Sequence, residues 1–170
     1  MEVFLILKFE KDIILFLPNS ILKQMEDCVE SAYPNEACGL AFGKREQINN
    51  PKEKNDFLYY FNIERFNCID SDKKSPIAFL IENVEKLNQI YHEAHQKFNM
   101  KLVSIFHSHP SGNYPSGVDR ENMERLQNSG LKLFQFIIWT IMDAENKDVK
   151  GFIFLNNEIN QVEVKIKNSK

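Results

Sequence analysis

The stretch that most constrains the fold is the run Ile-Phe-His-Ser-His-Pro over residues 105–110. It continues an apolar segment over 101–106 with β-branched residues at positions 103 and 105, a pattern that predicts a strand. Side chains two residues apart on a strand face the same way, so we expect His107 and His109 on one side and Ser108 on the other. Pro110 should end the strand because it has no N–H for the ladder.

A third polar group follows this strand closely in sequence. Residues 111–117 are rich in Ser, Gly, Asn and Pro, which predicts turns, and a helical pattern resumes at Asp119. Asp119 should therefore lie in the first turn of a helix and face the end of the strand. Two imidazoles and one carboxylate make three ligands, the number that a catalytic zinc site uses. The alternative is an exposed turn, but His107 and His109 are two of only four histidines and stand at strand spacing beside a carboxylate.

These residues resemble the signature of the JAMM (MPN+) zinc metallopeptidases: an upstream Glu, then His-Ser/Thr-His, a loop, a Ser, two residues and an Asp. The segment Tyr-Pro-Asn-Glu-Ala-Cys-Gly-Leu over 33–40 is similar to the part of that family that carries the catalytic Glu. The resemblance implies that His107, His109 and Asp119 bind one Zn²⁺ per chain. It also implies that Glu36 is the general base and that Ser116 stabilises the oxyanion. The loop between His109 and Ser116 has six residues, one fewer than the family usually has.

Other reactive side chains receive weaker interpretations. Ser108 faces away from the metal ligands, so we expect it to support the site structurally. Cys38 could suggest a cysteine protease, but it lies in a run of small residues suited to close packing rather than at a helix N-terminus. His92 and His95 lack the His-Glu-x-x-His spacing of the zincins and lie on a solvated helix face, so we assign them no role.

The order of elements predicts one mixed α/β domain over 1–170. By resemblance, we expect an MPN-like (cytidine-deaminase-like) curved mixed sheet packed against two main helices, with a short helix after the metal motif. We expect a hairpin over 3–9 and 13–17, and helices over 21–32, 81–97 and 119–127, the first of them with its N-cap at 18–20. The expected strands are 37–43, 57–63, 101–106, 133–142, 150–155 and 161–166. Polar connections are expected over 44–56 and 64–76.

Composition limits the kinds of binding partner and the cellular location that we expect. A net charge of −3 argues against binding nucleic acid through phosphate contacts. No apolar run has the length of a membrane span, and charged residues at 8 and 10–12 interrupt the N-terminal one too early for a signal peptide. Three cysteines without a Cys-x-x-Cys pair suit a reducing cytosol better than a disulfide framework, and we expect a buried, unbridged Cys28. We therefore expect a cytoplasmic protein, and homodimerisation stays open.

The resemblance implies a deubiquitinase-like metallopeptidase that hydrolyses the peptide or isopeptide bond after the C-terminal tail of ubiquitin or a ubiquitin-like protein. One alternative is a peptidase that trims a ubiquitin-like sulfur-carrier protein. A non-catalytic MPN scaffold is a second, although all five signature positions are filled. A related domain associated with DNA repair is a third, and the acidic composition argues against it.

Overall fold

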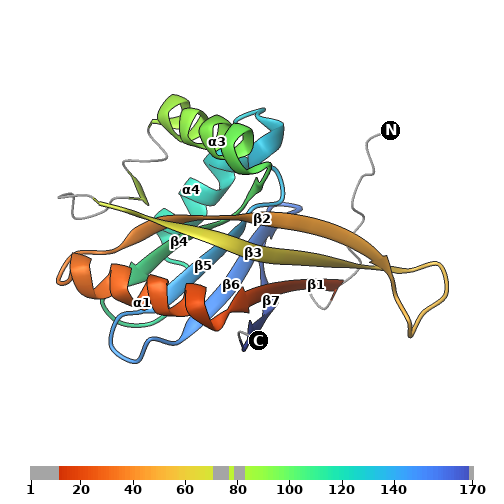
Figure 1. Cartoon of the computed structure of the whole chain (residues 1–170), viewed down its shortest axis with the longest axis horizontal. Helices are drawn as coiled ribbons and strands as arrows, with labels where there is room; N and C mark the ends of the chain where they lie inside the picture. Colours follow the sequence, from red (N-terminus) through yellow and green to blue (C-terminus); the bar gives the residue numbers. More distant parts are fainter. Residues whose placement is uncertain (1–11, 71–76, 79–82, 169–170) are drawn as a thin grey trace.

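The computed structural model describes residues 12–70, 77–78 and 83–168, and Figure 1 shows their arrangement around one mixed sheet. The elements in chain order are β1 (Ile13–Pro18), α1 (Asn19–Ala32), β2 (Cys38–Asn49), β3 (Phe57–Ile69), α3 (Val84–Phe98), β4 (Lys101–His109), α4 (Gly117–Gln127), the short 3₁₀ helix η2 (Lys132–Phe134), β5 (Ile138–Asp143), β6 (Val149–Leu155) and β7 (Glu158–Lys167).

The seven described strands run in the order β1-β3-β2-β4-β5-β6-β7, and β7 pairs with β1 to close the sheet. The pairs β1/β3, β1/β7 and β4/β5 are parallel, and the other pairs are antiparallel. β4 therefore lies between β2 and β5. This central position fixes the backbone of the strand that ends in the two histidines.

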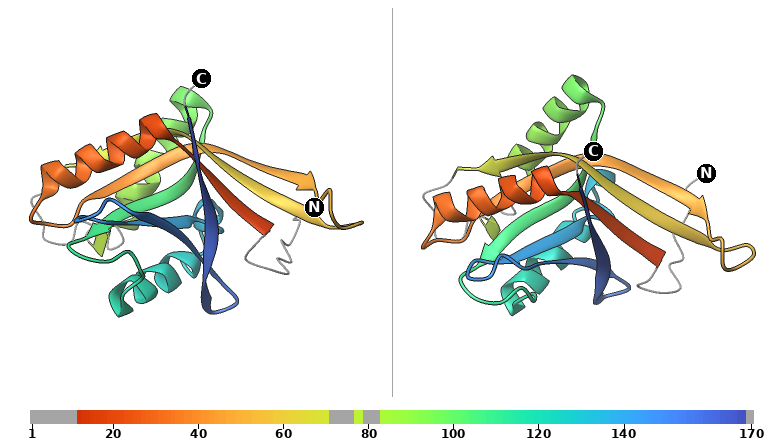
Figure 2. Two further views of the ribbon diagram at one scale, coloured as in Figure 1. Left: turned by 90° about the horizontal axis from the view of Figure 1, so that it is seen from below. Right: turned by 60° about the horizontal axis from the view of Figure 1, so that its bottom comes forward.

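The two faces of the sheet are covered by different helices (Figure 2). One apolar cluster joins α1, through residues such as Met25 and Val29, to inward residues such as Phe106. The other joins Leu87 of α3 and Met123 of α4 to residues such as Ile105 on the opposite face. Because side chains alternate along a strand, His107 and His109 follow Ile105 onto the face that α4 covers. Ser108 follows Phe106 onto the face that α1 covers.

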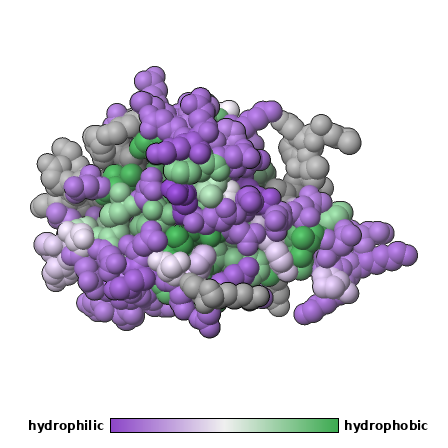
Figure 3. Space-filling model, viewed as in Figure 1, coloured by the Kyte–Doolittle hydropathy of each residue, from purple (hydrophilic) through white to green (hydrophobic). Residues whose placement is uncertain are grey.

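Both expected polar connections are partly strand, which corrects the sequence interpretation. β2 continues to Asn49 and β3 to Ile69, and the two pair as a long antiparallel hairpin with one register shift between Phe42 and Gly43. The polar side chains over 44–49 are mostly exposed while their backbone groups pair with β3, so polarity did not exclude a strand here. The hairpin projects from the body of the molecule (Figure 1), and its far end is largely hydrophilic (Figure 3).

Of three further local expectations, one was wrong, one was met only in part, and one can be tested only in part. The strand expected over 133–142 begins only at Ile138, because η2 and a left-handed Phe136 (φ 60°) precede it. Pro18 occupies the N-cap position of α1, and no side chain caps that helix. β1 pairs in parallel with β3 and β7, whereas residues 3–9, the other half of the expected hairpin, lie outside the described residues, as do positions 81–82 of the expected helix.

The cysteine expectation was also wrong. Cys28 is buried, as expected, but it forms a disulfide with Cys68 that joins α1 to β3. Only Cys38 is a free thiol among the cysteines, all of which are described. The expectation of a cytoplasmic location loses the support that it drew from cysteine usage. None of the described helices has both the length and the apolar character needed to cross a membrane.

Candidate metal centre

The three expected ligands converge at one end of β4. His107 and His109 are the last two positions of that strand on the face that α4 covers, and Asp119 lies in the first turn of α4, as the sequence predicted. His107 is fully buried, Asp119 is almost fully buried, and the side chain of His109 is 14% exposed. The site is therefore reached from solvent past His109.

The ligand atoms face one another at short distances. His107 Nε2 is 2.9 Å from Asp119 Oδ1, His109 Nε2 is 3.1 Å from Asp119 Oδ2, and the two Nε2 atoms are 3.1 Å apart. Two ligands of a tetrahedral zinc ion with bonds of about 2.0–2.1 Å are about 3.3 Å apart. The donor set and its spacing therefore fit a divalent metal such as zinc. His107 Nδ1, by contrast, is buried without a hydrogen-bond partner among the described residues, whereas a ligating histidine usually has one there.

Ser116 fixes the position of Asp119 through a capping box at the start of α4. The Asp119 N–H donates to Ser116 Oγ at 3.1 Å, and the Ser116 N–H donates to Asp119 Oδ2 at 2.7 Å. These reciprocal bonds satisfy two backbone donors at the helix N-terminus and orient the carboxylate toward the histidines. The Ser116 hydroxyl accepts in this arrangement, so its own proton can still be donated to another group.

Burial and hydrogen bonding act in opposite directions on the pKa values of Asp119 and His109. Burial alone would raise the pKa of Asp119, but hydrogen bonds from His107, His109 and the Ser116 N–H hold that pKa well below its usual range. The hydrogen bond to Asp119 raises the pKa of His109 against the effect of burial, and the charges of Glu36 and Asp143 act in the same direction. Asp119 is thus a carboxylate at neutral pH, the form that binds a metal.

Glu36 approaches the centre from the segment before β2. It is half-buried, and its carboxylate is close enough to His109 to influence that residue's pKa. The next residue, Ala37, donates its N–H to Ser108 Oγ at 2.8 Å and accepts from the Ser108 N–H at 3.1 Å. Ser108, which we expected to support the site, thereby joins the Glu36 segment to the strand that carries the histidines.

The loop after His109 is held by residues that sequence reasoning missed. Asp143, at the end of β5, accepts from the Gly112 N–H at 2.9 Å, and Asn113 donates to Asp148 at 2.7 Å. Gly112 has φ 84°, a conformation that favours glycine. The available signal for Asp143 was an Asp directly after the strand expected over 133–142, but its partner in the loop is 31 residues away.

The other candidate side chains lie elsewhere. Cys38 is fully buried, and burial raises the pKa of its thiol, so it is not placed as a thiolate nucleophile. His92 and His95 lie on α3, and His95 Nδ1 is 3.4 Å from the Met100 carbonyl oxygen. Within the described residues, His107, His109 and Asp119 form the one group of three or more side chains arranged to hold a metal ion.

The fold and the site together define a mixed α/β domain that has, among its described residues, one sheet, the three α-helices α1, α3 and α4, and a candidate metal centre of two histidines and an aspartate. The sequence matches the family of prokaryotic homologs of the JAB domain over residues 18–152, which is most of the chain. The protein belongs to this family.

Solved structures have a similar fold. The solution structure of protein DSY2949 from Desulfitobacterium hafniense has a TM-score of 0.63 and 23% sequence identity, and the match covers 92% of this chain and 94% of that one. AF2198, a JAB1/MPN domain protein from Archaeoglobus fulgidus, has a TM-score of 0.50 and 18% identity over 88% of this chain and 96% of that one. At these identities the structures support the fold alone. A search of curated protein sequences found no match.

Proposed function

We propose that the protein is a zinc-dependent peptidase that hydrolyses the peptide or isopeptide bond after the C-terminus of a ubiquitin-like protein. The observation that carries the proposal is the convergence of His107, His109 and Asp119 in a member of the JAB family. The nearby carboxylate of Glu36 supports a catalytic rather than a scaffolding role, because a scaffold needs no such group beside a metal site.

The chain's own residues would divide the chemistry among them. A zinc ion held by His107, His109 and Asp119 would activate water, by lowering its pKa toward about 7, and polarise the scissile carbonyl. The Glu36 carboxylate would take a proton from the attacking water and return it to the leaving amine. The Ser116 hydroxyl would donate a hydrogen bond to the oxyanion that develops on the carbonyl.

Exposed apolar side chains in the segments that carry the site are compatible with an extended peptide as substrate. Tyr33 is 72% exposed and precedes the Glu36 segment, Tyr114 is 61% exposed in the loop after His109, and Val118 is 57% exposed beside Asp119. All three belong to segments that also carry a residue of the proposed site or flank one. They would contact the residues on either side of the scissile bond.

The sheet also offers an edge for a peptide tail. β1 pairs with β3 only over 59–62, so from Ile63 to Ile69 β3 pairs with β2 and with no other described strand. At the end of this edge, Ile69 pairs with Cys38, which pairs with His107. An extended tail that paired with this edge of β3 would therefore run toward the three paired residues Ile69, Cys38 and His107, the last of which is a proposed metal ligand.

The test is cleavage of a ubiquitin-like protein that carries a C-terminal extension, with products identified by mass spectrometry. The zinc-loaded wild type should release the extension. Glu36→Gln should retain metal and fold but turn over about 10²–10⁴-fold more slowly, because glutamine cannot accept the proton. Glu30→Gln, an exposed change on α1, is the control and should behave as wild type.

Three results would contradict the proposal. A zinc-loaded wild type that cleaves no ubiquitin-like fusion, including a sulfur-carrier fusion, would favour the scaffold. Wild-type turnover by Glu36→Gln would place the base elsewhere. Loss of zinc from a folded Glu36→Gln would make Glu36 a ligand and overturn the ligand set.

A further inference from the structure

A basic pocket lies at the opposite end of β4 from the metal centre. It has a volume of about 370 Å³ and is lined by Arg45 of β2, Tyr91 and His92 of α3, Lys101 and Leu102 of β4, and Lys132 of η2. Lys101 begins β4 and His109 ends it, so eight residue steps of about 3.3 Å separate the pocket from the metal centre by about 26 Å. The pocket is thus separate from the metal centre.

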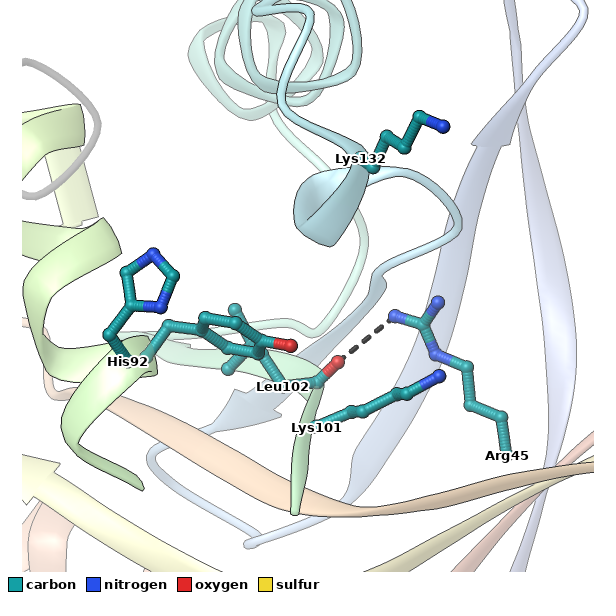
Figure 4. A pocket seen from close by; sticks show the side chains of 6 residues that line it. Arg45, His92, Lys101, Leu102 and Lys132 are labelled. Carbon is teal, nitrogen blue, oxygen red and sulfur yellow. Dashed lines mark hydrogen bonds between the residues drawn. The ribbon is translucent and has the colours of Figure 1, made fainter. Parts of the chain in front are cut away.

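Arg45 is fixed in the wall of this pocket by the protein backbone. Its guanidinium donates to the Leu102 carbonyl at 2.9 Å and to the Gln135 carbonyl at 3.2 Å (Figure 4 draws the first bond). A guanidinium has five N–H groups, so three remain after these two bonds. One of them is on Nε, which is buried without a hydrogen-bond partner among the described residues.

The charge of Arg45 has no anionic partner in the described part of the chain. Both of its hydrogen bonds go to neutral carbonyl oxygens, and its other recorded contact is with the ring of Phe61 at 5.4 Å. Burial lowers the pKa of Arg45 to about 10, with the Tyr91 phenol acting in the opposite direction, so the guanidinium stays charged at neutral pH. A partly buried cation without a counter-charge is costly, and an anionic ligand would offset that cost.

Two more cations line the same pocket. In Figure 4 the head groups of Arg45 and Lys101 lie close to each other, the head group of Lys132 lies apart from both, and the ring of His92 lies on the other side of the pocket. No carboxylate is among the described lining residues, although the whole chain has a net charge of −3. Such a concentration of one charge in a concave site raises the local concentration of the opposite ion.

We propose that this pocket binds a small phosphate monoester through Arg45, Lys101 and Lys132. A dianionic phosphate can accept hydrogen bonds from donors that approach from several directions, and these three side chains line the pocket from three different elements, β2, β4 and η2. The pocket volume lies within the range of sites for small molecules. The proposal does not depend on peptidase activity.

The test is a titration of the full-length, isotope-labelled protein with inorganic phosphate, adenosine 5′-monophosphate and adenosine, followed through backbone amide resonances. The monophosphate should shift the amides of Tyr91, Lys101 and Leu102, and adenosine should not. A response to inorganic phosphate as well would show that the phosphoryl group suffices. A response to the monophosphate alone would show that the organic part adds affinity.

Variants distinguish binding of phosphate in this pocket from a general effect of the protein's positive charge. Arg45→Ala removes two hydrogen bonds to the backbone and can unfold the protein, so the informative variant is Lys101→Gln with Lys132→Gln. It should weaken binding of the monophosphate about tenfold or more. Lys52→Gln with Lys54→Gln removes the same charge at the exposed tip of the β2–β3 hairpin and should not weaken it.

Any of three results would overturn the proposal. One is the absence of shifts at the pocket amides with both phosphate probes at millimolar concentration, or shifts confined to His107 and Asp119. Another is an equal response to adenosine. The last is equal weakening by the two lysine pairs.

Discussion

At the scale of single residues, Ser116 combines a structural bond with a proposed catalytic one. Ser116→Ala removes the helix cap and should lower the free energy of unfolding by about 1 kcal/mol, whereas Ser116→Gly should lower it by only a few tenths. Both variants lack the hydroxyl, so both should lose about 10²–10³ in turnover. Denaturant unfolding and the fusion-cleavage assay measure the two effects. If turnover instead falls in proportion to the loss of stability, so that Ser116→Gly loses little activity, the oxyanion role is contradicted.

The residues of the site were predictable where the signal is local. The spacing of His107 and His109 on a strand and the place of Asp119 at a helix start depend on neighbouring residues, and the structure confirms both. Asp143 was not predictable in its role, because its bond to Gly112 depends on how β5 lies against the loop. The catalytic roles of Glu36 and Ser116 stay predictions, drawn from the family resemblance.

At the scale of elements, one buried hydroxyl joins β4 to the segment that carries Glu36. Ser108→Ala would leave the buried Ala37 N–H without its acceptor and should cost about 1–3 kcal/mol of stability. It should also lower turnover while leaving metal content unchanged, because the proposed base moves and the ligands do not. Thermal unfolding, metal analysis and the cleavage assay give the three values.

Ser104→Ala is the matched control on the same strand. Ser104 is equally buried and its hydroxyl is 3.0 Å from Thr140 Oγ1, so its loss should also destabilise the protein. It should not change turnover, because Ser104 is not bonded to the Glu36 segment. Similar turnover in folded Ser104→Ala and Ser108→Ala would show that Ser108 does not position the base.

The Cys28–Cys68 disulfide joins two further elements, α1 and β3. It closes a loop with a sequence separation of 40, so its reduction should lower the free energy of unfolding by about 2–4 kcal/mol. Thiol titration of the denatured, non-reduced protein should find one free thiol, that of Cys38. Three free thiols in protein purified without reductant would contradict the bridge.

The elements themselves were predictable to different degrees for physical reasons. The strand over 101–106 and the helix after the metal motif were confirmed, because apolar periodicity in each reflects burial against its neighbours. Residues 44–49 form a strand because their backbone pairs with β3, and the polar character of their side chains does not reveal this pairing. The disulfide depends on packing of α1 against β3, which cysteine spacing does not reveal.

At the scale of the whole molecule, closure of the sheet and the placement of helices on both faces build the candidate metal centre. β4 is paired on both sides at His107, with Cys38 and with Ile141, and α4 covers the face toward which both histidines point. These long-range pairings hold the two histidines on a fixed strand, and the capping box sets the carboxylate opposite them. The central claim is therefore that one metal ion binds between β4 and α4.

The most direct test of this claim is an anomalous difference map, collected at the zinc absorption edge, from crystals of protein purified without chelator. We expect one strong peak per chain, about 2.0–2.2 Å from His107 Nε2, His109 Nε2 and one carboxylate oxygen of Asp119. Crystals of His109→Ala should lose most of that peak, because two remaining ligands hold zinc weakly. A zinc-supplemented crystal with no peak at this position, or with its peak on Glu36 instead of Asp119, would contradict the account.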